Sequence, residues 1–276
     1  MCLVTAGIVG GCTAPTTPSD VPSVVQKVTS GHFTDNKNGT VSFSYNNTNK
    51  EKCKVVTQLE GGKMYQYELP QGQCDMVFPL SQGNGKYRIY LCKNTTGSKY
   101  SVVESTSITV ELDDDLSVFL GSNYIINWNT ENEAIKKAYE LTKDLTTDED
   151  KIKAIYEYMV KNFSYDYEKM EGVNDGSVDK AYVPDTDATY YAKKGICYDI
   201  SSLTASMLRS VSIPAKVVTG YSSNTVSYHA WNSVYYTPKE EWKTMDLTYD
   251  IQMYQDGYRY YMYKNDEYYS NVMYWY

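Results

Sequence analysis

Between His32 and Leu112 the chain alternates apolar and polar residues in short runs that turn signals such as Asn38-Gly39 interrupt. Alternation with a period of two places every second side chain on one face of an extended strand, which is the pattern of half-buried β-structure. We interpret as strands the runs Thr40 to Tyr45, Cys53 to Leu59, Met64 to Leu69, Lys86 to Leu91 and Tyr100 to Leu112. Their spacing predicts an Ig-like antiparallel β-sandwich over residues 30–112.

An acidic triplet, Asp113-Asp114-Asp115, follows the last of these predicted strands. The three carboxylates lack the alternate spacing and the glycine of an EF-hand loop, so we interpret them as a solvated domain boundary and not as a calcium site. The expected organisation is a tether over residues 1–29, the sandwich over residues 30–112 and a second domain over residues 113–276.

In the second domain the apolar positions first recur at helical spacing. One helix is expected over residues 131–145, and another is expected to begin at the Thr146-x-x-Glu149 capping box and to end near Asn162. Their apolar stripes are Ala134, Ile135, Ala138, Leu141 and Leu145 in the first, and Ile152, Ile155, Tyr156, Met159 and Val160 in the second. The polar residues 169–187 are interpreted as a long loop.

Alternation returns after a further predicted helical stretch, Ser201 to Val211, which follows the run Lys193 to Cys197. The strands expected there are Ala215 to Tyr221, Tyr228 to Tyr236, Glu241 to Leu247 and Tyr258 to Tyr263. Helices followed by antiparallel strands define an α+β domain.

Composition and charge narrow the classes of partner. The net charge is -8 and no stretch gathers lysine and arginine, so we expect no nucleic-acid partner, because phosphate contacts need clustered cations. Tyrosine contributes 30 residues, and it is enriched toward the C-terminal end. We expect most of these tyrosines to pack in the core and its rim, and some to line a substrate cleft.

The first residues carry an export pattern. Residues 1–11 are small and apolar, and the run Val9-Gly10-Gly11-Cys12 resembles a bacterial lipobox, in which the signal is cut before a cysteine that then carries lipid. A Thr/Pro/Ser-rich spacer follows Cys12, as suits a tether. The expected location is the extracellular face of the bacterial membrane, through a lipid on Cys12, or the medium.

Three of the remaining cysteines, Cys53, Cys74 and Cys92, fall in the predicted sandwich, and Cys197 stands far along the chain from them. In an exported protein, two of the three could pair, but spacing does not say which two, and buried thiols explain the same residues equally well.

Cys197 has the setting of a nucleophile. It follows Gly195-Ile196 and opens a predicted helix, where backbone N–H groups and the helix dipole favour the thiolate and could donate to an oxyanion. His229, one of two histidines in the chain, lies on a predicted strand in the same half. A thiol nucleophile needs a neighbouring base, and imidazole is the usual one.

A third residue would orient that imidazole. Asp246 lies on the next predicted strand, and adjacent antiparallel strands can set a carboxylate beside a histidine, which fixes its tautomer. Asp250 or Asn232 could fill the same role. The residues therefore predict a triad in the order Cys197, His229 and Asp246, with the third position open.

Several runs together resemble the transglutaminase-like superfamily, over roughly Glu131 to Tyr263. The matching runs are Gly195-Ile196-Cys197-Tyr198-Asp199, Ile213-Pro214-Ala215-Lys216-Val217-Val218-Thr219-Gly220-Tyr221, His229-Ala230-Trp231 and Trp242-Lys243-Thr244-Met245-Asp246-Leu247-Thr248. The resemblance implies a papain-like α+β fold, with Cys197 as nucleophile, His229 as base and Asp246 as the orienting acid. It further implies acyl transfer from amide or peptide carbonyls through a thioester.

Departures from the family limit what it implies. Ile196 and Tyr198 stand where animal cross-linking enzymes have Gln and Trp, and the acidic metal sites of those enzymes have no clear counterpart, so we expect no cofactor and no metal. The resemblance is to microbial secreted or lipid-anchored members, with a peptide or protein substrate that includes cell-wall peptide. Tyr190, Tyr191 and Trp231 are candidates for the oxyanion side chain or the cleft.

Two other classes of function fit the same residues. An exported sandwich joined to a tyrosine-rich domain could be a non-catalytic cell-surface protein that binds peptide or glycan. Alternatively, Cys197, His229 and Asp246 could together bind zinc, although a cysteine that opens a helix is a weak case for a metal ligand. The reactivity of the Cys197 thiol distinguishes the enzyme from the binding protein, and stoichiometric zinc in a metal analysis would indicate the metal site.

Overall fold

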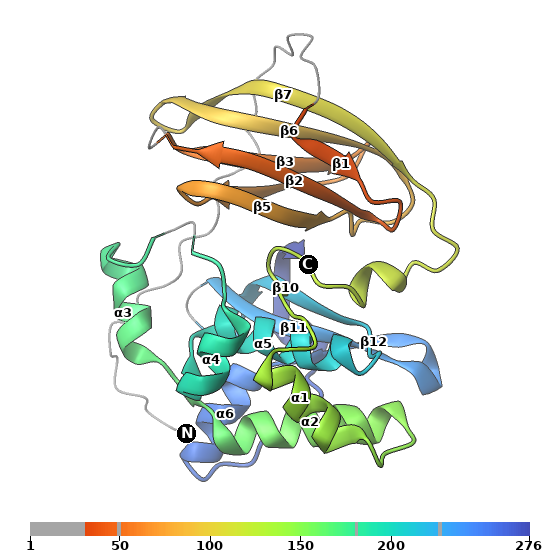
Figure 1. The fold of residues 1–276 in the computed structure, drawn as a ribbon. Helices are drawn as coiled ribbons and strands as arrows, with labels where there is room; N and C mark the ends of the chain where they lie inside the picture. The colour runs from red at the N-terminus through yellow and green to blue at the C-terminus, as the bar shows by residue number, and fades with distance from the viewer. Residues whose placement is uncertain (1–30, 49–50, 180–181, 226–227) are drawn as a thin grey trace. The chain divides into compact units, whose positions relative to one another are not determined.

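The computed structural model describes residues 31–48, 51–179, 182–225 and 228–276 (Figure 1). Contacts between Cα atoms divide the chain into two compact units. Of the described residues, the first unit contains those from 31 to 125 together with Tyr182, Val183 and Tyr276, and the second contains Ile126–Asp179 and Pro184–Trp275. Tyr124 belongs to the first unit, where its N–H donates to the carbonyl of Val77 over 2.7 Å. Residues 113–125 thus follow the last strand of that unit and lie within it.

The first unit consists of two antiparallel sheets. One has the strand order β1-β2-β5 and the other has the order β4-β3-β6-β7. Phe78 of the first sheet contacts Tyr67 of the second, with ring centroids 4.7 Å apart, so aromatic packing joins the sheets. The strands are β1 (Phe33–Asp35), β2 (Thr40–Asn47), β3 (Cys53–Leu59), β4 (Met64–Leu69), β5 (Gly72–Pro79), β6 (Gly85–Thr96) and β7 (Lys99–Val110).

All five strands predicted from alternation are present, and two of them are longer than expected. The sequence missed β5, because a glycine opens it, a proline closes it and its apolar positions do not alternate. It also missed the short β1. Cys53, Cys74 and Cys92 are buried thiols that form no disulfide in this described part of the chain.

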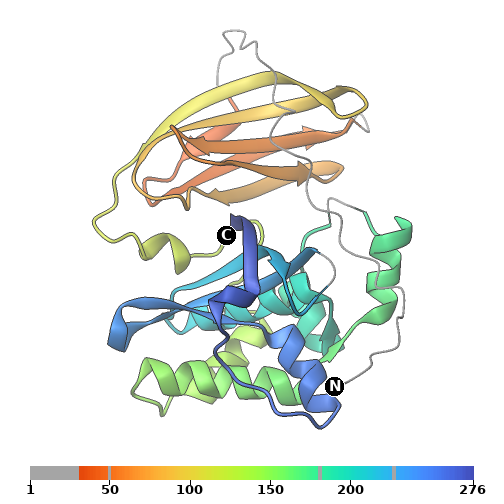
Figure 2. The same cartoon turned by 180° about the vertical axis from the view of Figure 1, so that it is seen from behind.

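The second unit packs helices against one antiparallel sheet of order β12-β11-β10-β13, which confirms the α+β class. Helix α5 is central: it contacts β10 and β11 as well as helices α1, α2, α4 and α6 (Figure 1). Seen from behind, α2 and α6 lie side by side (Figure 2). The helices are α1 (Glu133–Thr142), α2 (Asp148–Asn162), α3 (Tyr167–Asp175), α4 (Thr186–Ala192), α5 (Cys197–Ser210) and α6 (Leu247–Gln255).

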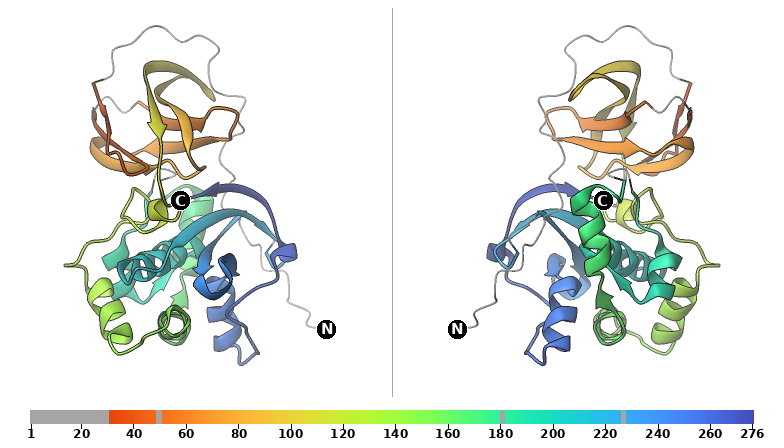
Figure 3. Two further views of the ribbon diagram at one scale, coloured as in Figure 1. Left: turned by 90° about the vertical axis from the view of Figure 1, so that its right-hand side faces the viewer. Right: turned by 90° about the vertical axis from the view of Figure 1, so that its left-hand side faces the viewer.

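The strands of this sheet twist, as the side views show (Figure 3). They are β10 (Ala215–Ser222), β11 (Tyr228–Tyr236), β12 (Glu241–Met245) and β13 (Tyr269–Trp275), and a separate parallel bridge joins β8 (Ser164–Tyr165) to β9 (Lys194–Gly195). Short 3-10 turns lie at Ser117–Phe119, Thr237–Lys239 and Asp266–Tyr268.

The second predicted helix buries its whole predicted stripe, but its cap lies one residue later than expected. Thr147, not Thr146, is the N-cap, and its side chain accepts from the N–H of Asp150. Both threonines precede a run of acidic residues, so either register satisfies the spacing rule. The first predicted helix is shorter than expected: α1 ends at Thr142, so Leu145 lies beyond it, and both Leu141 and Leu145 are only partly buried.

Three further predictions for this unit were wrong. Residues 169–187, expected to be loop, contain most of α3 and the start of α4, each begun by an aspartate that caps the helix, Asp166 and Asp185. The strand expected to reach Leu247 ends at Met245, where α6 follows. Residues 258–263 form no strand, and the fourth strand is β13, whose tyrosines alternate less regularly.

The predicted tether and the lipidation site at Cys12 lie outside the described residues. No helix among the residues that the structure describes is both long and apolar enough to span a bilayer.

Candidate active site

Cys197 is the first residue of α5, and a buried carboxylate holds the turn before it. The side chain of Asp199 accepts from the N–H of Ile196 over 3.0 Å, and it also binds the ammonium of Lys169 from α3 over 2.8 Å. Asp199 is 1% exposed. The ammonium therefore offsets the cost of burying a carboxylate two residues from the thiol.

The glycine before this helix is required by close packing. A Cβ at Gly195 would lie 2.7 Å from the Cβ of Asp199, which is closer than side chains approach. Gly195 also pairs with Tyr165 in the short parallel bridge. Gly195 is thus held by Asp199 on one side and by Tyr165 on the other. A larger residue at position 195 would displace the first turn of α5.

Two anchors set the direction of α5 over the sheet. The side-chain amide of Asn232 in β11 donates to the carbonyl of Ser201 over 2.8 Å, and Arg209 donates to the carbonyl of Ala215 over 2.8 Å. Ala215 pairs with Val234. Ser201 therefore lies beside Asn232, and Arg209 lies beside the Ala215–Val234 pair further along β11. Helix α5 and strand β11 thus run in the same direction.

Strand register brings His229 and Tyr269 to one face of the sheet. Gly220 lies opposite His229, and Ser222 lies opposite Tyr269. Gly220 and Ser222 are two residues apart on β10, and side chains two residues apart share a face. Trp231, two residues beyond His229, lies between them on this face: its ring is stacked on His229 and is 5.0 Å from Tyr269.

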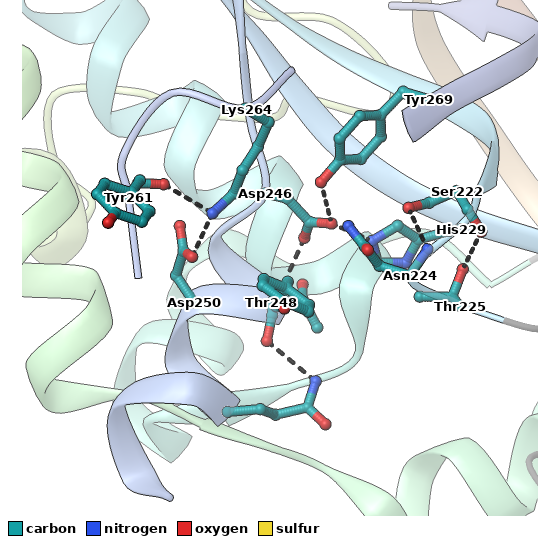
Figure 4. A network of polar contacts seen from close by, with 12 residues as sticks. Ser222, Asn224, Thr225, His229, Asp246, Thr248, Asp250, Tyr261, Lys264 and Tyr269 are labelled. Atoms are coloured by element: carbon teal, nitrogen blue, oxygen red, sulfur yellow. Dashed lines mark hydrogen bonds and ion pairs between the residues drawn. The ribbon is translucent and has the colours of Figure 1, made fainter. Parts of the chain in front are cut away.

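Asp246 joins the same group from the neighbouring strand. Met245 ends β12 opposite Asn232, and the chain then turns into α6 with Asp246 as its N-cap. One carboxylate oxygen, Oδ1, accepts from the N–H of Tyr249 over 3.1 Å. The other oxygen, Oδ2, is 2.8 Å from Nε2 of His229 (Figure 4).

Asp246 is held as an ionised carboxylate although it is 0% exposed. Burial raises the pKa of Asp246, but the charge and hydrogen bond of His229, the N–H of Tyr249 and the hydroxyl of Tyr269 outweigh burial, so its pKa is lowered. A carboxylate accepts only, so His229 donates through Nε2, and its other nitrogen, Nδ1, carries the lone pair in the neutral ring. This is the tautomer that can take a proton at Nδ1.

A second carboxylate lies one turn further along α6. Asp250 accepts from the hydroxyl of Tyr156 over 2.8 Å and forms an ion pair with Lys264 (Figure 4). Burial raises its pKa to about 6, against the opposing effects of Lys264 and Tyr156. The structure thus places Asp246 beside the imidazole and pairs Asp250 with a lysine, and Asn232 is engaged with α5.

The other sequence candidates have different surroundings. Tyr190 of α4 lies in an aromatic cluster, where the ammonium of Lys193 is 3.3 Å from its ring centroid and the hydroxyl of Tyr158 is 3.4 Å from its own. Tyr191, its neighbour, is 66% exposed. Trp231 alone of the three is in contact with His229.

Sequence reasoning missed the polar residues that surround Asp246 and Asp199. Tyr269, Lys264 and Lys169 come from segments interpreted as tail or loop, and nothing in their spacing points to the site. The dense tyrosines near the C-terminal end were the one available signal. Among the residues that the structure describes, no group of three or more His, Cys, Asp or Glu side chains is placed to hold a metal ion.

Residues 135–247 match the model of the transglutaminase-like superfamily. This part of the chain, which includes Cys197, His229 and Asp246, is a transglutaminase-like core. Among curated proteins, the uncharacterized protein YebA of Bacillus subtilis (strain 168) is 32% identical over 127 residues. The match covers 40% of this chain and only 17% of that protein, so the chain spans less than a fifth of its relative's length.

Two solved structures are similar in fold. A candidate cysteine protease from Cytophaga hutchinsonii is 18% identical with a TM-score of 0.41, and the match covers 76% of this chain and 71% of that one. Red sea bream transglutaminase is 13% identical with a TM-score of 0.32, covering 76% and 48% respectively.

Proposed function

We propose that this protein is a thiol enzyme that transfers acyl groups from amide or peptide carbonyls, with Cys197 as nucleophile and His229 as base. The observation that carries the proposal is the buried hydrogen bond between Nε2 of His229 and the ionised Asp246, inside a transglutaminase-like core whose cysteine opens a helix. Peptides and proteins, including cell-wall peptides, are the proposed substrates.

The shared direction of α5 and β11 supports the pairing of Cys197 with His229. Cys197 lies one turn before Ser201, and His229 lies three residues before Asn232, so both precede the anchor that joins the two elements. Alternation turns His229 away from the face that Asn232 occupies. The thiol and the imidazole therefore lie toward the same end of α5 and β11, the end at which both elements begin.

In the proposed reaction, Nδ1 of His229 takes the proton of the Cys197 thiol, and the thiolate attacks the carbonyl carbon. Backbone N–H groups in the first turn of α5 stabilise the oxyanion that forms. The imidazolium, stabilised by Asp246, gives its proton to the leaving amine, and a thioester remains on Cys197. Water or a second amine then releases the acyl group and regenerates the thiol.

Selective alkylation tests the nucleophile. At pH 6 we expect iodoacetamide to modify Cys197 at least about tenfold faster than any other described cysteine, because an adjacent base supplies thiolate there. Burial raises the pKa of Cys53 and Cys74, and raises that of Cys92 to about 12, so those thiols stay protonated. Mass spectrometry of peptides after a timed quench measures the four rates.

Matched variants separate the nucleophile from a thiol that is merely accessible. Cys197→Ala should abolish the rapid phase, His229→Ala should slow it, and Cys92→Ala should leave it unchanged. Equal modification of Cys197 in the wild type and in His229→Ala would contradict the proposed thiol–imidazole pair.

We further propose that the protein is exported and carries lipid on Cys12, on the strength of the lipobox-like run that ends there. Cells fed an alkyne-tagged fatty acid should then label the wild-type chain in the membrane fraction, and Cys12→Ala should leave the chain unlabelled, because acyl chains supply the membrane affinity. Equal labelling of both chains, or none of the wild type, would rule out this anchor.

A further inference from the structure

Tyr269 contacts the acid of the proposed site from a segment outside the family match. Its hydroxyl donates to Oδ2 of Asp246 over 3.0 Å, the same oxygen that faces His229 (Figure 4). Tyr269 is 9% exposed and is the first residue of β13, whereas the match to the transglutaminase-like model ends at residue 247. Oδ2 of Asp246 is thus bound both by His229 of the matched core and by Tyr269 of β13, which follows that core in the chain.

The phenol can act only as a donor to this carboxylate. Burial and the neighbouring charge of Asp246 raise the pKa of Tyr269 far above its ordinary value, so the hydroxyl keeps its proton. The side chain of the exposed Asn224 acts on the same hydroxyl in the opposite direction, because it lowers the pKa of Tyr269. A phenol whose pKa is lowered in this way is a better donor, so Asn224 favours the bond that Tyr269 donates to Asp246.

Packing fixes the phenol ring as well as its hydroxyl. Trp231 is 2% exposed, contacts the Tyr269 ring on one side and is stacked on His229 on the other. Val218 completes the same apolar cluster. The position of the imidazole and that of the tyrosine are therefore coupled through one buried indole.

We propose that Tyr269 is a positioning residue of the active site: it shares Oδ2 of Asp246 with His229 and so sets the orientation and basicity of the imidazole. This inference rests on the proposed function in one respect only, which is that His229 acts as the base. It assigns to β13 a part of the site that the core alone does not contain.

The effect on His229 has a definite sign. While Tyr269 donates to Oδ2, part of that oxygen's negative charge is taken up by the phenol. Without the hydroxyl the whole charge acts on the imidazolium, so the pKa of His229 should rise. Other titratable groups near Asp246 are Tyr249 and Asp250 on α6, Tyr156 from α2 and Lys264, and none of these is altered by the substitution.

The test follows the titration of the two histidines by NMR in protein labelled with carbon-13 histidine. In Tyr269→Phe we expect the pKa of His229 to rise by about 0.5 unit or more, the size expected for loss of one buried hydrogen bond. His32, which pairs with Glu104 in the other unit, should not move. A His229 pKa within about 0.2 unit of the wild type, or a lower one, would overturn the proposal.

Two further variants keep the test decisive. Tyr274→Phe makes the same change on the same strand, on the opposite face of the sheet, and should leave His229 unshifted. Asn224→Ala alters an exposed residue, so it should fold even if Tyr269→Phe does not, and it should raise the pKa in the same direction by less. If Tyr269→Phe does not fold and the pKa of His229 does not rise in Asn224→Ala, the proposal is overturned.

The titration is performed in both the wild-type and the Cys197→Ala backgrounds, so that it does not depend on thiol chemistry. If His229 shifts as expected while Cys197 of the wild type reacts no faster than the other thiols, Tyr269 positions the histidine and the proposed enzyme is wrong. If Cys197 reacts rapidly and His229 does not shift, only the role of Tyr269 is wrong.

Discussion

Asp246→Asn is expected to slow acylation of Cys197 by about 10³- to 10⁴-fold while the protein stays folded. Asparagine caps helices as well as aspartate does, so α6 keeps its N-cap. At the Oδ2 position, however, an amide nitrogen would face two donors, Nε2–H of His229 and the hydroxyl of Tyr269. The imidazole then relieves this clash by moving its proton to Nδ1, and Nδ1 can no longer accept the thiol proton.

The measurement is the rate of acyl-enzyme formation from a peptide amide, followed by the mass of the thioester-bearing chain. Asp250→Asn is the matched control, because it makes the same change one turn along the same helix, at a carboxylate that is equally buried and binds Lys264 and Tyr156 instead of His229. It should alter acylation only a few-fold. Equal losses from the two variants would contradict the assignment of the orienting acid to Asp246.

Lys264→Met is expected to lower the free energy of unfolding by about 3 kcal/mol at pH 8, and by less at pH 5. The change leaves the 0% exposed carboxylate of Asp250 without its cation. In the wild type the pKa of Asp250 is already raised, from 3.8 to about 6. The Asp250 carboxyl group therefore stabilises the fold most when it is protonated. This contribution declines as the pH rises from about 4 to about 6.

Without Lys264 the pKa of Asp250 rises further, so the decline extends to higher pH and the difference between the two proteins grows from pH 5 to pH 8. Urea unfolding at several pH values measures it. Lys161→Met is the control: its ammonium is 2.9 Å from Glu157 on the surface of α2, and exposed pairs of this kind add little. A loss for Lys264→Met that is constant with pH would contradict the role given to Asp250.

One contact of the candidate site followed from local patterns. His229 lies on β11 and Asp246 directly follows the neighbouring strand β12, so alternation was enough to predict that these two residues lie side by side. The fold class followed from the same periodicities. Alternation could not distinguish Asp246 from Asp250 as the orienting acid. Asp246 caps α6 and Asp250 lies within it, and this helix was not predicted.

The rest of the site depends on long-range contacts. Tyr269 reaches Asp246 across 23 residues, and Lys169 reaches Asp199 across 30. Such pairs are set by sheet order and helix packing, and no local rule encodes them. Strand β13 was missed because residues 258–263 have the same tyrosine-rich composition and were assigned the strand in its place.

The position of Tyr269 in the chain has a consequence for biosynthesis. Strand β13 forms an edge of its sheet, and it is made after every residue of the nucleophile, base and acid. If Tyr269 positions His229 as proposed, a nascent chain that has already produced Cys197, His229 and Asp246 still lacks a fully organised base. The protein would then be latent while it is being synthesised, and the last strand to join the sheet would also switch on its chemistry.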